Sequence, residues 1–124
     1  RWMNEGLAQW VEGKKMDIQA KDAFLSYQFT KRVPDITQLD AVLSAQQNPF
    51  NNKEMTLSYM KAFSLVEYLI EENGVWSFAQ FAQNQDTAVS QEELFKKYFH
   101  ANLQQIEERW LRWLERKRSH VVIN

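Results

Sequence analysis

The chain has 124 residues, with 15 Lys and Arg against 16 Asp and Glu, two His and no Cys. That length suits one domain, and the 44% of hydrophobic residues supply enough apolar material for a packed core. The formal charge of −1 gives no overall field that attracts nucleic acid or an anionic membrane. The lack of cysteine excludes a disulfide scaffold, a thiolate metal site and a cysteine nucleophile.

Helical spacing of apolar residues runs through the chain, and the three glycines and two prolines leave few turn signals. We expect an all-α fold of five to seven packed helices, with a single domain over residues 1–117 and a flexible tail over 118–124. The first helix is expected over residues 2–12, with Gly13 as its C-terminal cap. Because this helix is patterned from Trp2 onward, we expect the chain to be part of a longer protein.

The later helices follow in chain order. One is expected over residues 18–29, and a short one, capped by Asp35, carries Ile36 and Leu43. After a loop over residues 46–53, a helix over 55–72 is apolar almost all round and should be central to the core, ending at Asn73-Gly74. The last three are expected over residues 76–84, 90–99 and 102–117, the latter two with capping boxes.

Glu5 is the candidate for chemistry in the first helix. At 100° per residue it falls opposite the apolar face, on the side of Gln9 and Glu12. This is either a solvated acidic face or a face that supplies a carboxylate oxygen to a metal. His100 and His120 lie too far apart for a pair of metal ligands on one helix. The apolar face is made of Met3, Gly6, Leu7, Trp10 and Val11.

Three segments carry a resemblance to a known family. The segment W-M-N-E-G-L-A-Q-W at residues 2–10 resembles the helix W-L-N-E-G-L/F-A-x-Y/W of gluzincin zinc metallopeptidases, which include relatives of aminopeptidase N and the bacterial peptidase MA-like domains. Residues 58–66 look like the Tyr-bearing helix of that group, and residues 101–114 like its closing Trp helix. The resemblance implies that Glu5 is the third zinc ligand and that Tyr59 donates a hydrogen bond to the oxyanion. Ala62, where the aminopeptidase branch has Gly, favours the peptidase MA-like group.

The H-E-x-x-H segment of this family, with its two His ligands and its general base, has no counterpart in the sequence. The resemblance therefore implies the C-terminal helical half of a gluzincin-like domain, whose zinc is held only in the complete protein. The partners implied are an upstream segment bearing H-E-x-x-H and a peptide or protein substrate. We expect this chain alone to bind no zinc and to hydrolyse no peptide bond. By the same resemblance the parent is expected to be a peptidase, exported or membrane-anchored in a bacterium.

Two other functions compete with this interpretation. The chain could be a non-catalytic helical interaction module that keeps a degenerate peptidase-like fold. It could also bind nucleic acid through Arg112 and Arg116, although Glu107, Glu108 and Glu115 dilute the charge there, and we expect a solvated cationic helix end instead. If the first helix normally packs on upstream helices, its apolar face should favour self-association.

Overall fold

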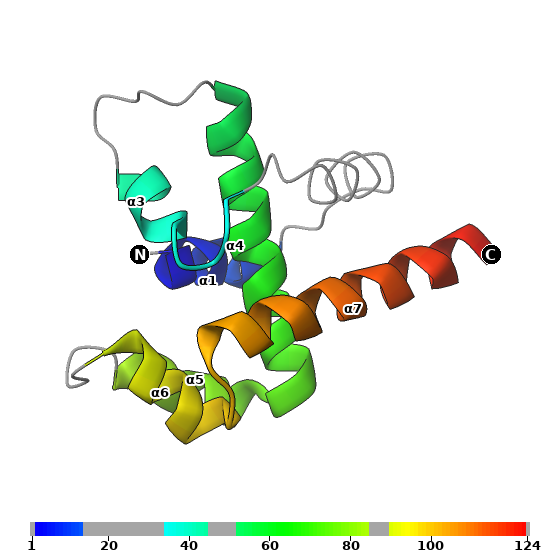
Figure 1. Cartoon of the computed structure of the whole chain (residues 1–124). Helices are drawn as coiled ribbons and strands as arrows, with labels where there is room; N and C mark the ends of the chain where they lie inside the picture. Colours follow the sequence, from blue (N-terminus) through cyan, green and yellow to red (C-terminus); the bar gives the residue numbers. More distant parts are fainter. Residues whose placement is uncertain (1, 14–33, 45–51, 85–89, 124) are drawn as a thin grey trace.

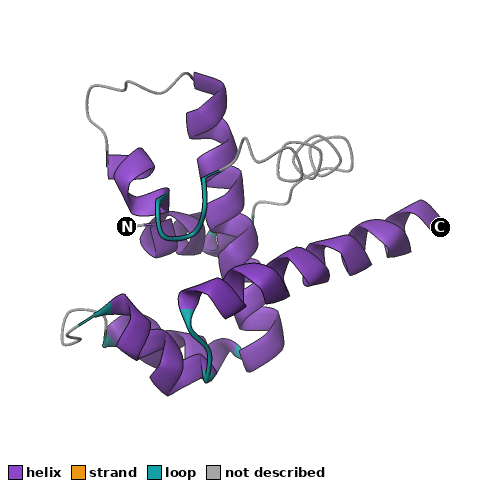
Figure 2. Cartoon of the chain, in the orientation of Figure 1, coloured by secondary structure: helices purple, strands orange, loops and turns teal. Residues whose placement is uncertain are grey.

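Six helices make up the part of the chain that the computed structural model describes, which is residues 2–13, 34–44, 52–84 and 90–123. Within those ranges the chain has no strand (Figure 2), which confirms the all-α prediction. The helix predicted over residues 18–29 and most of the loop predicted over 46–53 lie outside the described residues. The helices are α1 (Trp2–Val11), α3 (Leu39–Ser44), α4 (Asn52–Asn73), α5 (Val75–Gln83), α6 (Gln91–Phe99) and α7 (Leu103–Ile123).

Helix α4 is the centre of the fold, as its apolar circumference predicted. It contacts α1, α3, α5 and α7, which lie around it (Figure 1). Ala62, Leu65, Val66 and Leu69 of α4 are completely buried. Burial of each of the larger of these side chains contributes on the order of 1.5–3 kcal/mol, so α4 holds its neighbours together.

Local signals end α1 and α4 and cap the start of α6 where the sequence indicated. Gly13 after α1 and Gly74 after α4 adopt positive φ angles of 73° and 87°, a conformation that glycine adopts without steric cost. Ser90 accepts a hydrogen bond from the backbone of Glu93 at 3.2 Å and so caps α6.

The second capping box, before α7, is complete. The backbone N–H of Gln105 donates to Oδ1 of Asn102 at 2.8 Å, and the backbone N–H of Asn102 donates to Oε1 of Gln105 at 2.9 Å. These reciprocal bonds satisfy N–H groups that a helix start otherwise leaves open.

An aromatic cluster joins α5 and α6 to α1. The ring of Phe81 lies 4.9 Å from that of Phe95 and 4.7 Å from that of Phe99, and Trp2 stacks on Phe95 at 6.2 Å. All four side chains are buried. The N-terminal end of α1 is therefore part of the hydrophobic core.

Helix α7 is longer than the sequence pattern indicated. It does not end at Lys117 but continues to Ile123, because no glycine or proline interrupts it after that position. Figure 1 shows it crossing α4 and extending beyond the other helices toward the C-terminus. None of the helices in the described ranges combines the length and hydropathy needed to cross a bilayer.

Candidate functional site

The crossing of α1 over α4 brings together the two segments that carry the predicted site residues. Its closest point is Gly6, which is buried against the backbone of α4. A Cβ atom on Gly6 would overlap the carbonyl oxygen of Ala62 and lie 2.7 Å from Cγ2 of Val66. Since real Cβ atoms do not approach this closely, only glycine permits α1 to lie so near α4.

Glu5 and Tyr59 belong to turns that meet at this crossing. The side-chain Nε2 of Gln9 donates at 3.4 Å to the backbone oxygen of Glu5 and at 3.4 Å to that of Tyr59. Both residues are partly buried, and the ring of Tyr59 packs against the hydrophobic core. The predicted ligand and the predicted hydrogen-bond donor are thus on neighbouring turns, although they are far apart in the sequence.

The buried face of α1 differs from the face that the sequence predicted. Trp2, Met3 and Gly6 are buried, whereas Trp10 is 36% exposed and Val11 is 71% exposed. The helix is rotated so that Gly6, which permits the closest approach, faces α4. Glu5 therefore lies at the edge of the buried face and not opposite it.

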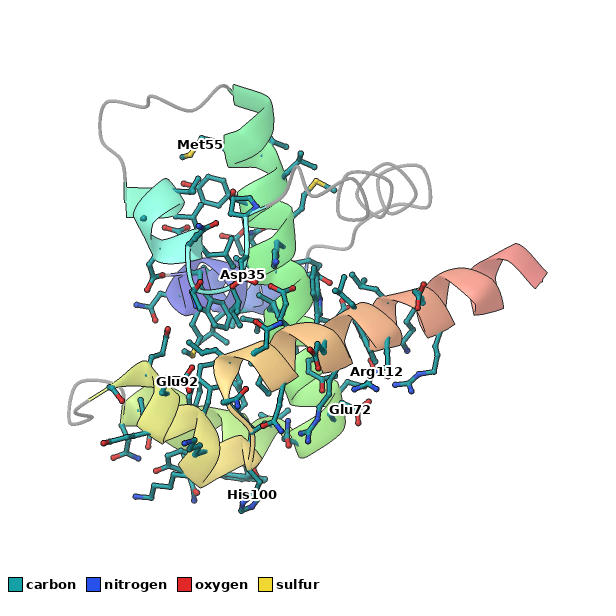
Figure 3. All side chains as sticks on the ribbon, viewed as in Figure 1. Asp35, Met55, Glu72, Glu92, His100 and Arg112 are labelled. Carbon is teal, nitrogen blue, oxygen red and sulfur yellow. The ribbon has the colours of Figure 1, made fainter. Side chains whose placement is uncertain are left out.

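The fit to a metal is limited to one carboxylate. Among the residues that the structure describes, no three side chains of His, Asp or Glu are grouped so that they could hold a metal ion. Glu5 offers the oxygen donor that zinc accepts, but a zinc site needs several converging ligands. The described residues therefore do not make a zinc site by themselves. His100 ends α6 as an exposed residue in the left-handed conformation (Figure 3).

The N-terminal end of α1 is held by a residue from α3. The backbone N–H of Trp2 donates to Oδ1 of Asp40 at 2.7 Å. A carboxylate at this end of a helix satisfies an otherwise open N–H group and interacts favourably with the helix dipole. Asp40 and Gly6 thus fix α1 at two places within its first two turns.

A buried ion pair joins α4 to α7. Nζ of Lys61 lies 2.6 Å from Oε1 and 2.9 Å from Oε2 of Glu107, and the side chains are 0% and 6% exposed. The same Nζ donates to the backbone oxygen of Pro34 at 2.7 Å. Glu107 Oε1 also accepts from the backbone N–H of Ile36 at 2.9 Å. The three donors of the ammonium group and both oxygens of the carboxylate therefore have partners.

Two further contacts complete this network. The Lys61 ammonium lies 4.8 Å from the centre of the Trp110 ring, and the indole N–H of Trp110 donates to Oγ of Ser64 at 2.9 Å. Burial lowers the pKa of Lys61 below its ordinary value, while the charge of Glu107, its hydrogen bonds and the charge of Asp35 oppose that shift. Figure 3 shows Asp35 in the segment that leads to α3. The network therefore connects α4, α7 and the residues before α3.

This network was not predicted from the sequence, because Glu107 was expected to be one of the charges that solvate the last helix. Glu107 is in fact buried. A signal was present: Leu103, Glu107, Trp110 and Leu114 recur at the three- and four-residue spacing of a buried helix face. Arg109 and Arg112, by contrast, are exposed, as a solvated cationic face requires.

Comparisons of the chain with protein families, with curated proteins and with solved structures found no match. The gluzincin resemblance therefore stays a prediction from the residues quoted for it, and its role for Glu5 and Tyr59 is a proposal.

Proposed function

We propose that the chain is the C-terminal helical part of a zinc-peptidase-like domain of the gluzincin type. In the complete protein Glu5 is the third metal ligand, and Tyr59 donates a hydrogen bond to the oxyanion that forms on the substrate. The other partners are an upstream segment with H-E-x-x-H, which supplies two His ligands, and a peptide or protein substrate. The chain by itself does not carry out the reaction.

The observation that carries the proposal is the contact of Gly6 with α4. It gives a physical reason for the order Asn-Glu-Gly, because the residue after the proposed ligand must be glycine for α1 to reach the backbone of Ala62. The same contact brings the turn of Glu5 beside the turn of Tyr59, where one side-chain nitrogen of Gln9 bonds to the backbone of both. These are the two residues that the resemblance assigns to chemistry.

The different roles proposed for Glu5 and Tyr59 follow from the chemistry of their side chains. A carboxylate oxygen suits zinc, and a tyrosine hydroxyl is a hydrogen-bond donor that suits a developing negative charge. Bound zinc supplies the Lewis-acid chemistry of such a site. The remaining residues of the crossing hold the backbone of α1 and α4 in place.

The first test is the coding sequence that precedes Arg1. An in-frame H-E-x-x-H a short distance upstream supports the proposal, and an upstream helix without both His residues refutes it. With the His pair present, Glu5→Gln in the full-length protein is expected to weaken zinc binding by more than about 100-fold. This exceeds the loss that follows when a residue that only hydrogen-bonds to a metal ligand is removed. Glu12→Gln, directly after the end of α1, is the matched control and is expected to keep the zinc.

A second test addresses the tyrosine. Tyr59→Phe in the full-length protein is expected to lower kcat by about 100-fold or more with little change in KM, since the lost bond acts on the transition state. Tyr98→Phe removes the hydroxyl that accepts a hydrogen bond from Asn84 and serves as the control. A normal kcat for Tyr59→Phe would show that the Tyr59 hydroxyl takes no part in the reaction. The role of Glu5 would then be decided by the zinc-binding measurement alone.

The second candidate function is a non-catalytic helical interaction module with a degenerate peptidase-like fold. It is favoured by the start of α5, where Trp76 is 84% exposed and Val75 is 54% exposed. A solvent-facing tryptophan is typical of a surface that binds another molecule. This candidate predicts an upstream sequence that lacks the His pair, so the same first test separates the two functions.

A further inference from the structure

The segment of residues 34–44, here called the α3 segment, lies between two polar anchors. At its start, the backbone oxygen of Pro34 and the backbone N–H of Ile36 bond to Lys61 and Glu107. Further along, the carboxylate of Asp40 accepts the backbone N–H of Trp2 at 2.7 Å. The first anchor lies on α4 and α7, and the second lies on α1.

Three apolar side chains of this segment, those of Ile36, Leu39 and Leu43, are buried within the main core. The polar side chains of Thr37 and Gln38, which also lie between the anchors, are exposed. A close-packed segment of this kind does not deform gradually, so a displacement of one anchor is expected to move the other. The buried ion pair and the first turn of α1 are thus bonded to the same segment of the chain.

We propose that Asp40 is a positioning residue for the carboxylate of Glu5, and that the Lys61–Glu107 pair acts on Glu5 through Asp40. The contact of Gly6 with Ala62 fixes one point of α1 against α4, and the buried side chains of Trp2 and Met3 pack its first turn into the core. The bond from Trp2 to Asp40 adds a polar contact in the same first turn that carries Glu5. The packing and the polar bond together restrain the direction and the rotation of this turn, and hence where the Glu5 side chain begins.

The choice of an aspartate on α3 follows from the position of the bond. The backbone N–H of Trp2 lies 2.7 Å from Oδ1 of Asp40, so a short acidic side chain on α3 satisfies one open N–H group at the start of α1. An uncharged amide at position 40 would keep the acceptor oxygen but lose the attraction to the helix dipole. An alanine would lose both.

The experiment compares Asp40→Ala with Asp40→Asn in the chain as it stands, without metal. Amide hydrogen exchange is followed in α1 and, as an internal reference, in α6. Asp40→Ala is expected to speed exchange in the first turns of α1 by about fivefold or more while α6 is unchanged, and Asp40→Asn is expected to restore most of the protection. The carboxyl carbon signal of Glu5 in NMR is expected to shift in Asp40→Ala, whereas that of Glu12, just beyond the C-terminal end of α1, stays in place.

The double variant Lys61→Met with Glu107→Leu tests the connection to the ion pair. It removes both charges together, and it is expected to speed exchange in α3 and in the first turn of α1. Faster exchange in α3 with α1 unchanged would overturn the coupling. Equal effects of Asp40→Ala and Asp40→Asn, or an equal rise in every helix including α6, would overturn the positioning role of Asp40.

This inference rests on the proposed function in one respect, which is that the proposed function assigns Glu5 to zinc binding. Exchange rates and carboxyl signals are read without zinc or substrate. Failure of the coupling is thus distinguishable from failure of zinc binding, because the first appears in this chain and the second only in the full-length protein.

Discussion

The ion pair between Lys61 and Glu107 allows the sharpest test of the structure. Lys61→Met leaves the carboxylate of Glu107 buried, with the backbone N–H of Ile36 as a neutral hydrogen-bond donor to it. Breaking a buried pair in this way costs about 3–5 kcal/mol of unfolding free energy, because it leaves an uncompensated charge. Glu107→Leu is expected to cost a similar amount, since it takes the acceptor from Ile36 just as Lys61→Met takes the donor from Pro34.

The double variant is expected to be much closer to the wild type than the sum of the single variants. Replacing a whole buried pair by apolar residues is often neutral or stabilising by about 1–4 kcal/mol, because the desolvation penalty disappears. The double variant also leaves two backbone groups, the oxygen of Pro34 and the N–H of Ile36, without these partners. Each loss is expected to lower the unfolding free energy by about 1–3 kcal/mol. We therefore expect the double variant within about 2 kcal/mol of the wild type, and a coupling energy of about 4 kcal/mol or more.

The assay is unfolding in urea, followed by tryptophan fluorescence and by far-UV circular dichroism. The control is the surface pair of Lys117 and Glu71, whose charged atoms lie 2.8 Å apart with side chains 48% and 45% exposed. Its coupling energy is expected to be below about 1 kcal/mol. If a single variant at the buried pair fails to fold, a folded double variant still supports the reasoning. A coupling energy as small as that of the surface pair would refute it.

Four further predictions concern packing, pH, capping and association. Gly6→Ala is expected to destabilise by about 1–3 kcal/mol in urea unfolding, whereas the same change in an uncrowded helix stabilises by about 1 kcal/mol, so a gain would contradict the tight crossing. Because burial lowers the pKa of Lys61, the unfolded chain binds more protons between that lowered pKa and 10.5. The unfolding free energy of the wild type, relative to the uncharged double variant, should therefore rise with pH there, by at most about 1.4 kcal/mol per unit, and a fall would reverse the sign of the shift. Ser90→Ala is expected to cost about 1 kcal/mol in thermal unfolding, while Ser90→Asp keeps the cap and most of the stability. We expect the mass of the wild type measured by light scattering to rise with concentration, and the double variant Trp10→Ser with Val11→Ser to stay monomeric. A wild type that is monomeric at every concentration would count against self-association through this end of α1.

The local sequence was sufficient for most of the helices and their ends. Apolar spacing predicted α4 as the central helix, and the stops at Gly13 and Gly74 were predicted because few other residues adopt a positive φ readily. The capping box at Asn102 and Gln105 was likewise readable, since all of its atoms lie within one turn. Signals of this kind depend on neighbours in sequence and need no knowledge of the fold.

The candidate residues Glu5 and Tyr59 came from the resemblance. The tertiary structure decided that the turn of α1 that carries Glu5 lies beside the turn of α4 that carries Tyr59. Periodicity alone placed Glu5 opposite the buried face, because it gave the exposed Trp10 and Val11 the same weight as the buried Met3. Gly6, with no side chain, is the point of closest approach to α4, and this turns Glu5 to the edge of the contact.

The ion pair was decided by tertiary structure for a different reason. A lysine and a glutamate that lie far apart in sequence look like two surface charges, and each is expected to be solvated on its own. Only when α4, α7 and the residues before α3 converge do their charges and the backbone groups of Pro34 and Ile36 satisfy one another. The sequence by itself thus determined most of the helices that the structure describes and several of their ends, because those depend on backbone preferences within a turn. Which polar groups are buried together depended on contacts between distant segments, which only the folded chain brings within hydrogen-bonding distance.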